Sequence, residues 1–363
     1  MKNKLIEMDS ILFQQDLIEW FEREQRQLPW RIDRDPYKIW VSEIMLQQTR
    51  VDTVIPYFNR FIEWFPTLHD FADADEEKIL KAWEGLGYYS RVRNLQSAVR
   101  EVKENYGGFV PNNHKDLMSL KGVGPYTAGA ILSIAFNIPE PAVDGNVMRV
   151  ISRILYITED IAKPKTRKIF EEAVRKLISH ENPSAFNQAL MELGALICTP
   201  TSPACMLCPV NNHCEAFAQG VQTELPVKNK VTKVKKEKRL TAILINPIGE
   251  ILVQKRPETG LLAKLWEFPS FSFNDKKKIS KLLYEKEFQL AYNCRVQLDS
   301  EKLIEVQHVF SHLKWDMDAY KGVVTEEIPK SVLQANRLKW VSKEELQSLA
   351  FPVSYQKVYN AYQ

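Results

Sequence analysis

Glu43 is the first residue of this sequence whose type and surroundings could do chemistry. It lies in the otherwise apolar stretch Trp40–Leu46, on a helix expected to run from Tyr37 to about Arg50. A carboxyl group in apolar surroundings has a raised pKa and can hold a proton near neutral pH. The alternative is a glutamate whose side chain reaches from a core helix to solvent.

A turn containing two glycines lies between this carboxyl group and a second one. Gly122 and Gly124 join a helix that ends near Leu120 to an apolar helix expected over Tyr126–Ala135, with Pro125 in the first helical position. Exposed amides at such a turn bind phosphate well. The motif alone would equally fit an ordinary turn between two helices.

The second carboxyl group, Asp144, follows the helix after the glycine turn. It lies in the segment Pro141–Asn146, which reads as a capping sequence for a further helix over Val147–Leu155. An aspartate at a helix start, beside Asn146, is suited to stay ionised. The two carboxyl groups could therefore differ in protonation state.

Four of the five cysteines lie within seventeen residues, which is a strong signal for a metal site. Ligand type alone allows zinc, but one compact loop after a helix differs from the paired knuckles of zinc ribbons. The fifth, Cys294, is a lone thiol that we expect to serve packing. The candidate ligands are Cys198, Cys205, Cys208 and Cys214.

Length and composition limit the class of protein. The 363 residues suggest about two domains, and a net charge of only +3 means that any DNA-binding surface must come from local clustering. No apolar run is long enough to span a membrane, and Met1–Lys4 does not open a signal peptide. We therefore expect a cytoplasmic protein, nucleoid-associated if the source is bacterial.

Patterning changes between the two halves of the chain. Residues 1–220 read as helices, among them 8–27 and further helices within 164–197, and include the cysteine loop 198–214. Residues 221–239 read as a lysine-rich linker, and residues 240–363 alternate as strands in an α+β domain. The expected strands are Leu240–Asn246, Ile251–Lys255, Leu303–Phe310, Leu313–Tyr320 and Leu338–Val341, with a capping box at Ser342.

The chain resembles the MutY family, the adenine-specific branch of the helix-hairpin-helix (endonuclease III-like) DNA glycosylases. The resemblance covers nearly the whole chain, and its motifs occur in order. It implies an all-α glycosylase domain with a [4Fe–4S] cluster on the four cysteines. The motifs are Pro29–Arg31, Trp40–Glu43, Leu46–Thr49, Gly85–Tyr89, the glycine turn, Asp144–Asn146 and the cysteine loop.

The resemblance also implies a reaction. The family extrudes adenine mispaired with 8-oxoguanine, or with guanine, and hydrolyses its N-glycosidic bond. Glu43 would be the general acid and Asp144 would stabilise the oxocarbenium-like sugar. Endonuclease III has a lysine nucleophile where this chain has Tyr126, and a phenol cannot form a Schiff base, so the enzyme should be monofunctional.

Further roles carry over by position. Tyr126 and Asn146 would complete the catalytic site, and Arg31 and Gln188 would face the adenine, while Met148 receives no role. A monomer on double-stranded DNA is expected. The remaining residues expected to contact DNA or to fill the duplex are Trp30, Leu46, Gln48, Thr49, Leu86, Gly87, Tyr88, Gly122, Val123 and Gly124.

The second domain resembles the MutT-like (Nudix) fold, with Leu265–Pro269 in the characteristic place. It lacks the glutamate set that binds Mg²⁺ in working pyrophosphatases, because the expected helix Lys276–Leu290 offers only Glu285 and Glu287. We therefore expect a binding domain. Phe310, Ser311 and His312 lie at a turn between two strands, where they could read 8-oxoguanine, with Phe310 as a wedge.

Two alternatives stay open from the sequence. One is a bifunctional glycosylase, or one specific for another base. The other is a catalytically silent protein that binds damaged DNA. Whether Glu43 and Asp144 face one pocket distinguishes an enzyme from the silent protein.

Overall fold

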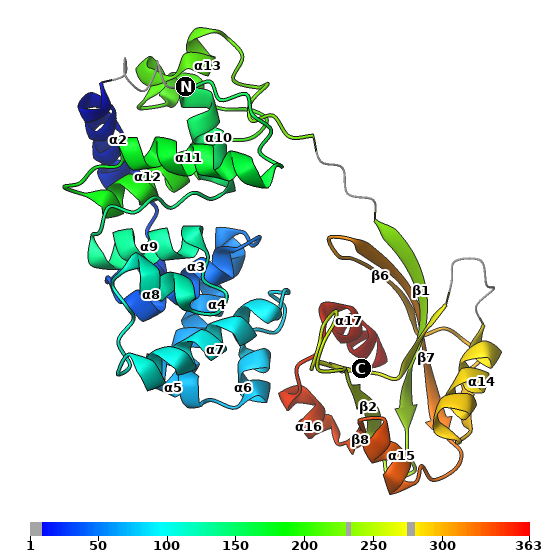
Figure 1. Cartoon of the computed structure of the whole chain (residues 1–363). Coiled ribbons are helices and arrows are strands. Elements are labelled where there is room, and N and C mark those ends of the chain that lie inside the picture. Colours follow the sequence, from blue (N-terminus) through cyan, green and yellow to red (C-terminus); the bar gives the residue numbers. More distant parts are fainter. Residues whose placement is uncertain (1–8, 230–233, 274–279) are drawn as a thin grey trace. The chain divides into compact units, whose positions relative to one another are not determined.

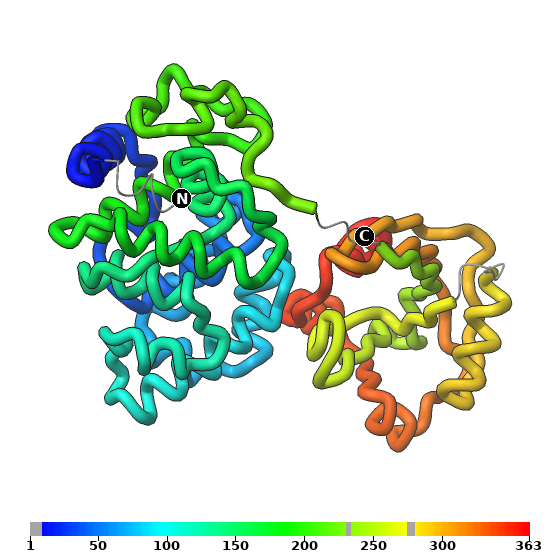
Figure 2. The backbone as a smooth tube through the Cα atoms, turned by 45° about the horizontal axis from the view of Figure 1, so that its top comes forward, coloured from blue at the N-terminus to red at the C-terminus, as the bar shows by residue number. Residues whose placement is uncertain are grey.

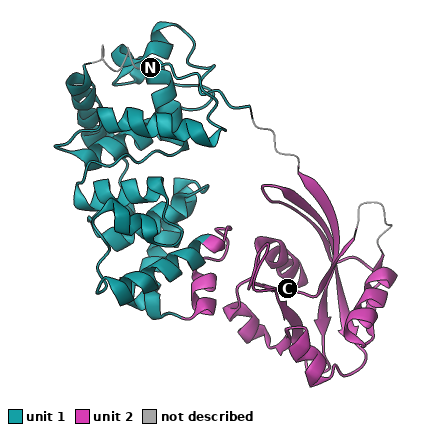
Figure 3. Cartoon of the chain, in the orientation of Figure 1, with its two compact units in different colours: residues 1–74, 91–230 teal, residues 75–90, 231–363 magenta. Residues whose placement is uncertain are grey.

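The computed structural model describes residues 9–229, 234–273 and 280–363. Met1–Lys4 and the first residues of the predicted helix Lys276–Leu290 therefore lie outside the described residues. The chain divides into two compact units, one of residues 1–74 and 91–230 and the other of residues 75–90 and 231–363 (Figure 3). Each unit is described by itself.

The helices of the first unit form two layers (Figure 1). Helix α2, which opens the described part of the chain, packs against α12, which comes much later in the sequence. The chain therefore returns to the first layer after passing through the second, as Figure 2 also shows. The first layer comprises α2 (Ser10–Glu24), α10 (Gly145–Ile154), α11 (Pro164–Leu177), α12 (Pro183–Leu196) and α13 (Glu215–Ala218). The second comprises α3 (Pro36–Leu46), α4 (Val51–Trp64), α5 (Leu68–Asp73), α7 (Ser90–Asn105), α8 (His114–Ser119) and α9 (Pro125–Phe136).

Side-chain caps explain where the helices next to the site begin. The Asp35 carboxylate accepts a hydrogen bond from the Tyr37 amide at 2.8 Å, and Pro36 takes the first helical position of α3. The predicted helices are confirmed, with ends that differ by a few residues. The sequence limits 8–27 were too wide for α2, and three short 3₁₀ helices, η1 (Pro29–Arg31), η2 (Cys205–Leu207) and η3 (Asn211–His213), complete the unit.

The end of α3 differs from the predicted limit at Arg50. The helix stops at Leu46, and Gln48 has a φ of 58°, a left-handed conformation that a non-glycine residue seldom adopts. The Arg91 guanidinium donates hydrogen bonds to the carbonyl oxygens of Ile44 at 2.9 Å, Met45 at 3.1 Å and Gln47. These bonds satisfy the last carbonyls of the helix, so the chain leaves α3 in a fixed direction.

Close packing fixes the path of the chain between α9 and α10. A Cβ atom added at Gly129 of α9 would lie 2.0 Å from the carbonyl oxygen of Pro141, so only glycine allows this approach. The residues after Pro141 lead directly to Asp144. The core of the first layer contains Phe13, Leu17, Val147, Val150, Ile151, Phe170, Phe186 and Leu190, all buried.

The second unit is built on a mixed sheet with the path β3-β2-β1-β7-β5, to which β4, β6 and β8 add at β1, β7 and β2. Its central strands, β1 and β7, are parallel. The strands are β1 (Lys235–Ile245), β2 (Ile251–Lys255), β3 (Trp266–Glu267), β4 (Ser270–Phe273), β5 (Val296–Leu298), β6 (Ile304–Val309), β7 (Leu313–Val324) and β8 (Leu338–Val341).

The predicted α+β pattern is confirmed, with one difference at the start of the sheet. The sequence placed Lys235–Arg239 in a linker, but they form the first part of β1, with Lys235 paired to Leu313. Ser342 caps a helix by accepting from the Glu345 amide at 3.1 Å, as its motif indicated. The helices of this unit are α6 (Glu76–Ala82), α14 (Lys281–Tyr292), α15 (Lys330–Ala335), α16 (Lys343–Ser348) and α17 (Val353–Tyr362).

Within the described ranges, none of the helices combines the length and apolar character that crossing a bilayer requires.

Candidate active site

A cavity of about 700 Å³ in the first unit is lined by residues of both helical layers. This volume lies in the range of small-molecule sites. Glu43 and Asp144 both line it, as do Tyr126 and Asn146. The structure also brings to its wall the predicted contacts Trp30, Arg31, Leu46, Gln48, Thr49, Gly122, Gly124 and Gln188.

Glu43 lies in the middle of α3 and is 5% exposed. Burial raises the pKa of its carboxyl group to about 7, while a hydrogen bond from Tyr126 works in the opposite direction. The Tyr126 hydroxyl donates this bond to Glu43 Oε2. Of the nearby charges, Asp144 raises the pKa of Glu43 and Arg31 lowers it. Glu43 is thus a buried acid rather than a side chain reaching solvent.

Asp144 is the N-cap of α10, and hydrogen bonds fix both of its oxygens. Oδ1 accepts from the Val147 amide at 2.7 Å, and Oδ2 accepts from Asn146 Nδ2 at 3.0 Å. Burial nevertheless raises the pKa of Asp144, against the lowering effect of these two bonds. The sequence predicted only the stabilising effect of the helix start, because burial at this position was not visible in the pattern.

A chain of hydrogen bonds links this carboxylate to the cysteine loop. Arg149 Nη2 donates to Asn146 Oδ1 at 2.8 Å, and Arg149 Nε donates to the carbonyl oxygen of Cys198 at 2.8 Å. Arg149 also binds the carbonyl of Gly194 at 2.7 Å, and it is buried. The positions of Asp144 and of the first cysteine are therefore mechanically connected.

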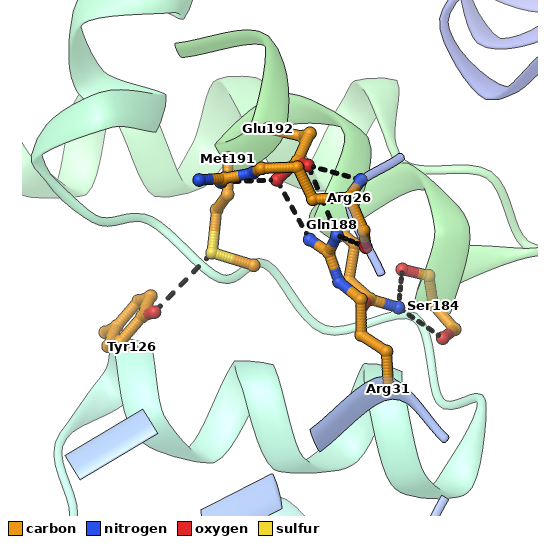
Figure 4. A network of polar contacts seen from close by, with 7 residues as sticks. All are labelled: Arg26, Arg31, Tyr126, Ser184, Gln188, Met191 and Glu192. Carbon is orange, nitrogen blue, oxygen red and sulfur yellow. Dashed lines mark hydrogen bonds and ion pairs between the residues drawn. The ribbon is translucent and has the colours of Figure 1, made fainter. Parts of the chain in front are cut away.

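The opposite wall of the cavity carries an ion cluster that sequence reasoning missed (Figure 4). Glu192, on α12, binds Arg26 Nη2 at 2.8 Å and Arg31 Nη2 at 3.0 Å. Arg31 Nε donates to Gln188 Oε1 at 3.1 Å, and Gln188 Nε2 donates to Ser184. Glu192 lies in an apolar stretch of its helix, the same signal that singled out Glu43, so the pattern could have revealed it.

The glycine turn has the geometry that its sequence requires. Gly122 has a φ of 80°, and a Cβ atom there would lie 2.9 Å from Cβ of Asn94. Val123 is buried and donates its amide to the Leu120 carbonyl at 3.1 Å, so it supports the turn without lining the cavity. Met148 is partly buried against the core of the first layer.

Leu86, Gly87 and Tyr88 belong to the segment that groups with the second unit. Tyr88 is 47% exposed and has a φ of 47°, so it is one of eight non-glycine residues with positive φ in the described part of the chain. Strained backbone of this kind concentrates at functional sites.

The tip of the β6–β7 hairpin presents Ser311 and His312 to solvent. Phe310 donates its amide to the Leu313 carbonyl at 2.7 Å, which closes the turn. Its ring packs edge-on against Trp315, with centroids 4.8 Å apart. Phe310 therefore anchors the tip in this structure, whereas the sequence suggested a wedge free to enter a duplex.

Two glutamates of the second unit, Glu285 and Glu267, make structural hydrogen bonds. Glu285, one of the two acidic residues noted on the helix of this domain, accepts a hydrogen bond from the Leu298 amide at 2.9 Å. Glu267 is buried and accepts from the Tyr355 hydroxyl at 2.7 Å. Cys294 is buried, as expected for a packing thiol.

The four clustered cysteines line one small cavity enclosed by apolar side chains. In the part of the chain that the structure describes, no three His, Cys, Asp or Glu side chains are placed to hold a single metal ion. The four thiols that line this cavity are ligands of the kind that hold iron–sulfur clusters. Burial raises the pKa of the Cys208 thiol to about 12 and of the Cys214 thiol to about 11, so forming thiolates requires a bound cation.

Arg153 supports the same loop from beneath. It is 1% exposed, and its Nη1 lies 3.2 Å from Cys198 Sγ and donates to the Thr199 carbonyl at 2.8 Å. A buried guanidinium favours the negative charge of a thiolate-bound cluster.

Three family models match the sequence. The HhH-GPD superfamily base excision DNA repair protein model covers residues 41–176, and the NUDIX domain model covers residues 240–361. The iron–sulfur binding domain of endonuclease III matches residues 198–214, which contain the four cysteines. The loop thus holds an iron–sulfur cluster of the [4Fe–4S] type, as the resemblance implied.

We predict that the purified protein is brown, with broad visible absorption and iron and sulfide in equal amounts. Cys208→Ser should lose colour and lower the soluble yield or DNA affinity, because the loop loses a ligand and its path changes. Cys294→Ser, which removes the buried thiol outside the loop, should keep the colour and serves as the control. Colourless, active protein with stoichiometric zinc would contradict the prediction.

Solved structures and curated proteins agree with the family models. A thermostable thymine-DNA glycosylase is 29% identical with a TM-score of 0.53, covering 58% of this chain and 97% of that one. The adenine DNA glycosylase of Homo sapiens is 34% identical over 97% of this chain and 74% of its own length, and that of Rattus norvegicus is 36% identical over 98% and 78%. Because this identity extends over both units, the chain belongs to the adenine DNA glycosylase family.

Proposed function

We propose that this chain hydrolyses the N-glycosidic bond of adenine mispaired with 8-oxoguanine or guanine in double-stranded DNA, acting as a monomer near the chromosome. The observation that supports this most strongly is that Glu43 and Asp144 line one cavity beside groups suited to a purine. A silent damage-binding protein would need no such pair. We propose base excision in particular because that reaction gives each of the two carboxyl groups a separate task.

Glu43 is the proton donor in this proposal. Adenine is a poor leaving group unless a ring nitrogen is protonated, and a carboxyl group with a pKa of about 7 can donate at neutral pH. The Tyr126 hydroxyl binds Oε2, which leaves Oε1 for the base. Tyr126 therefore orients the acid, and the absence of an amine at this position leaves the abasic product intact.

Asp144 stabilises the sugar. Bond cleavage leaves positive charge on the deoxyribose, and an ionised carboxylate held close to it lowers the barrier. The hydrogen bonds from Val147 and Asn146 favour that ionised form and keep the oxygens in place. A carboxylate that is already partly desolvated gains more from the developing charge than one in water.

Binding of the duplex uses residues outside this pair. The amides of the Gly122–Gly124 turn suit a phosphate, and Arg31 with Gln188 suits the edge of the flipped adenine. Gln48 and Tyr88, held in left-handed backbone conformations, would enter or fill the stack, aided by Leu86 and Gly87. The iron–sulfur cluster, when bound, would crosslink the loop that follows α12.

Ser311 and His312 are the proposed readers of the base opposite the adenine. Both are exposed at a closed turn, and a hydroxyl with an imidazole can contact a base edge. Phe310 fixes the turn against Trp315. A MutT-like domain whose acidic residues serve structure can still recognise an oxidised guanine.

We predict that Glu43→Gln binds duplex containing adenine opposite 8-oxoguanine but loses single-turnover excision by roughly 10²–10⁴-fold, the range typical of a general acid. In the unmodified chain the acid form exists below a pKa of about 7, so the rate should fall as pH rises through that value. The assay is strand scission after alkali. Glu104→Gln, at an exposed glutamate, is the control, and near-normal excision by Glu43→Gln would refute the role.

We predict that the chain leaves intact abasic sites, which break only with heat or alkali, and that borohydride traps little of it on DNA. Tyr126→Lys should gain lyase activity and become trappable, because a lysine there places an amine beside the sugar. Efficient trapping of the unmodified chain, after other lysines are excluded, would contradict a monofunctional reaction.

We predict that Ser311→Ala and His312→Ala together reduce the preference for adenine opposite 8-oxoguanine over adenine opposite guanine. Each hydrogen bond to a base edge that the double variant removes should cost about 1–3 kcal/mol of discrimination. Phe310 is retained so that the turn stays anchored. The control is Gln307→Ala, which removes a side-chain oxygen that accepts a hydrogen bond from Lys314 on strand β7. An unchanged ratio of the two excision rates would show that the tip does not read the lesion.

A further inference from the structure

Glu192 is a buried carboxylate on the wall of the cavity that the catalytic scheme above does not use. It is 1% exposed, and five N–H groups bind its two oxygens. Arg26 contributes its amide at 3.0 Å, Nε at 2.9 Å and Nη2 at 2.8 Å, and Arg31 contributes Nη1 at 3.2 Å and Nη2 at 3.0 Å. One carboxylate thus holds two guanidinium groups.

This arrangement fixes the groups that would meet a purine (Figure 4). Besides its bonds to Glu192, Arg31 donates a hydrogen bond from Nη1 to the Arg26 carbonyl at 3.0 Å and one from Nε to Gln188 Oε1 at 3.1 Å. Gln188 Nε2 donates to the carbonyl and hydroxyl oxygens of Ser184, each at 3.3 Å. The orientation of the Gln188 amide therefore follows from the orientation of Arg31, which follows from Glu192.

The same cluster sets the electric charge facing the acid. Arg31 and Glu43 line one cavity, and the Arg31 guanidinium favours the ionised form of Glu43. Burial opposes ionisation of Glu192, but hydrogen bonds from Arg26 and Arg31 outweigh it and lower the pKa of Glu192 to about 2. Because Glu192 is ionised at neutral pH, it offsets part of the positive charge of Arg26 and Arg31.

We propose that Glu192 is a positioning residue that holds Arg31 and Gln188 ready for the adenine and, by offsetting one of the two guanidinium charges, keeps Glu43 in its proton-donating form. The inference rests on the proposed function. It assigns Glu192 no contact with the substrate. Its effect passes through Arg31 to the base and through the local field to the acid.

The charged and titratable groups around Glu43 keep their chemical identity when Glu192 is replaced. They are Tyr126 on α9, Asp144 before α10 and Arg31 on η1, with Arg167 of α11 also on the cavity wall. Glu192→Gln removes one negative charge and leaves both arginines. The unbalanced positive charge should then stabilise the Glu43 carboxylate, so the acid form is lost at lower pH.

The experiment is single-turnover excision from a duplex with adenine opposite 8-oxoguanine, measured across pH. In Glu192→Gln we expect the alkaline limb of the profile to move to lower pH by roughly 0.5–1 unit. Glu192→Asp keeps the charge but shortens the reach, so its limb should stay in place while the rate falls roughly 10–100-fold at every pH. A merely structural role would lower rates without moving the limb.

Variants at Arg26 test whether removing a positive charge moves the alkaline limb in the opposite direction from removing the negative charge of Glu192. Arg26 is partly exposed, with 32% of its side chain accessible, so its replacement is tolerated better than that of Glu192. Arg26→Met removes a positive charge and should move the alkaline limb to higher pH. The double variant Arg26→Met, Glu192→Gln restores the balance of charge and should bring the limb back toward its original position.

The possible failures are distinguishable. If the unmodified chain does not excise adenine, the proposed function fails, whatever Glu192 does. If it excises adenine but Glu43→Gln retains excision, the acid role of Glu43 fails, and the electrostatic role of Glu192 fails with it, while the function stands. If Glu43→Gln is inactive but the limb stays fixed in both Glu192→Gln and Arg26→Met, the electrostatic role of Glu192 is overturned. If Glu192→Asp keeps the full rate below the limb, the positioning role is overturned. Should Glu192→Gln fail to fold, the shift in Arg26→Met still decides the sign.

Discussion

Removal of water from carboxyl groups is the constraint on which this site depends. Glu43, Asp144 and Glu192 all line the same cavity, yet burial leads to different outcomes. Burial dominates at Glu43 and raises its pKa to about 7, whereas two arginines at Glu192 lower the pKa to about 2. The hydrogen-bond partners, rather than residue type, thus decide which carboxyl group stores a proton and which carries charge.

The backbone makes this separation possible by bringing two helical layers together. Gly129 lets α9 approach the Pro141 carbonyl, which fixes the segment leading to Asp144. On the far side of Asp144, Asn146 and Arg149 join the carboxylate to the cysteine loop. Asp144 is therefore held from both directions, so its position relative to Glu43 depends on residues outside this pair.

Much of the helical unit, and the placing of Glu43 and Asp144 at one cavity, could be predicted from sequence because the signals are local. An apolar helix around Glu43 and a capping motif at Asp144 are visible in short windows. Glu192 stands out locally as a glutamate in an apolar helix, but its pairing with Arg26 joins residues 166 positions apart, which no window contains. The end of α3 was misplaced for a similar reason, since Arg91 fixes it from another helix.

In the second unit, the strand limits predicted from the side-chain pattern differ from those set by backbone pairing. Lys235–Arg239 read as a linker because their side chains are charged, but a ladder requires only backbone groups, and β7 supplies them. Phe310 looked like an exposed tip residue because its partner, Trp315, lies on the next strand. At both positions a contact with β7 outweighs what the local sequence suggests.

The return of the chain from α2 to α12 has a consequence for how the protein is made. The ribosome delivers α2 first, but its packing partner begins at Pro183. During synthesis the apolar face of α2, with Phe13 and Leu17, stays without its native cover while the whole second layer emerges. The cavity wall is completed only after α12 has left the ribosome, so a nascent chain that ends before α12 lacks this wall and leaves the apolar face of α2 uncovered.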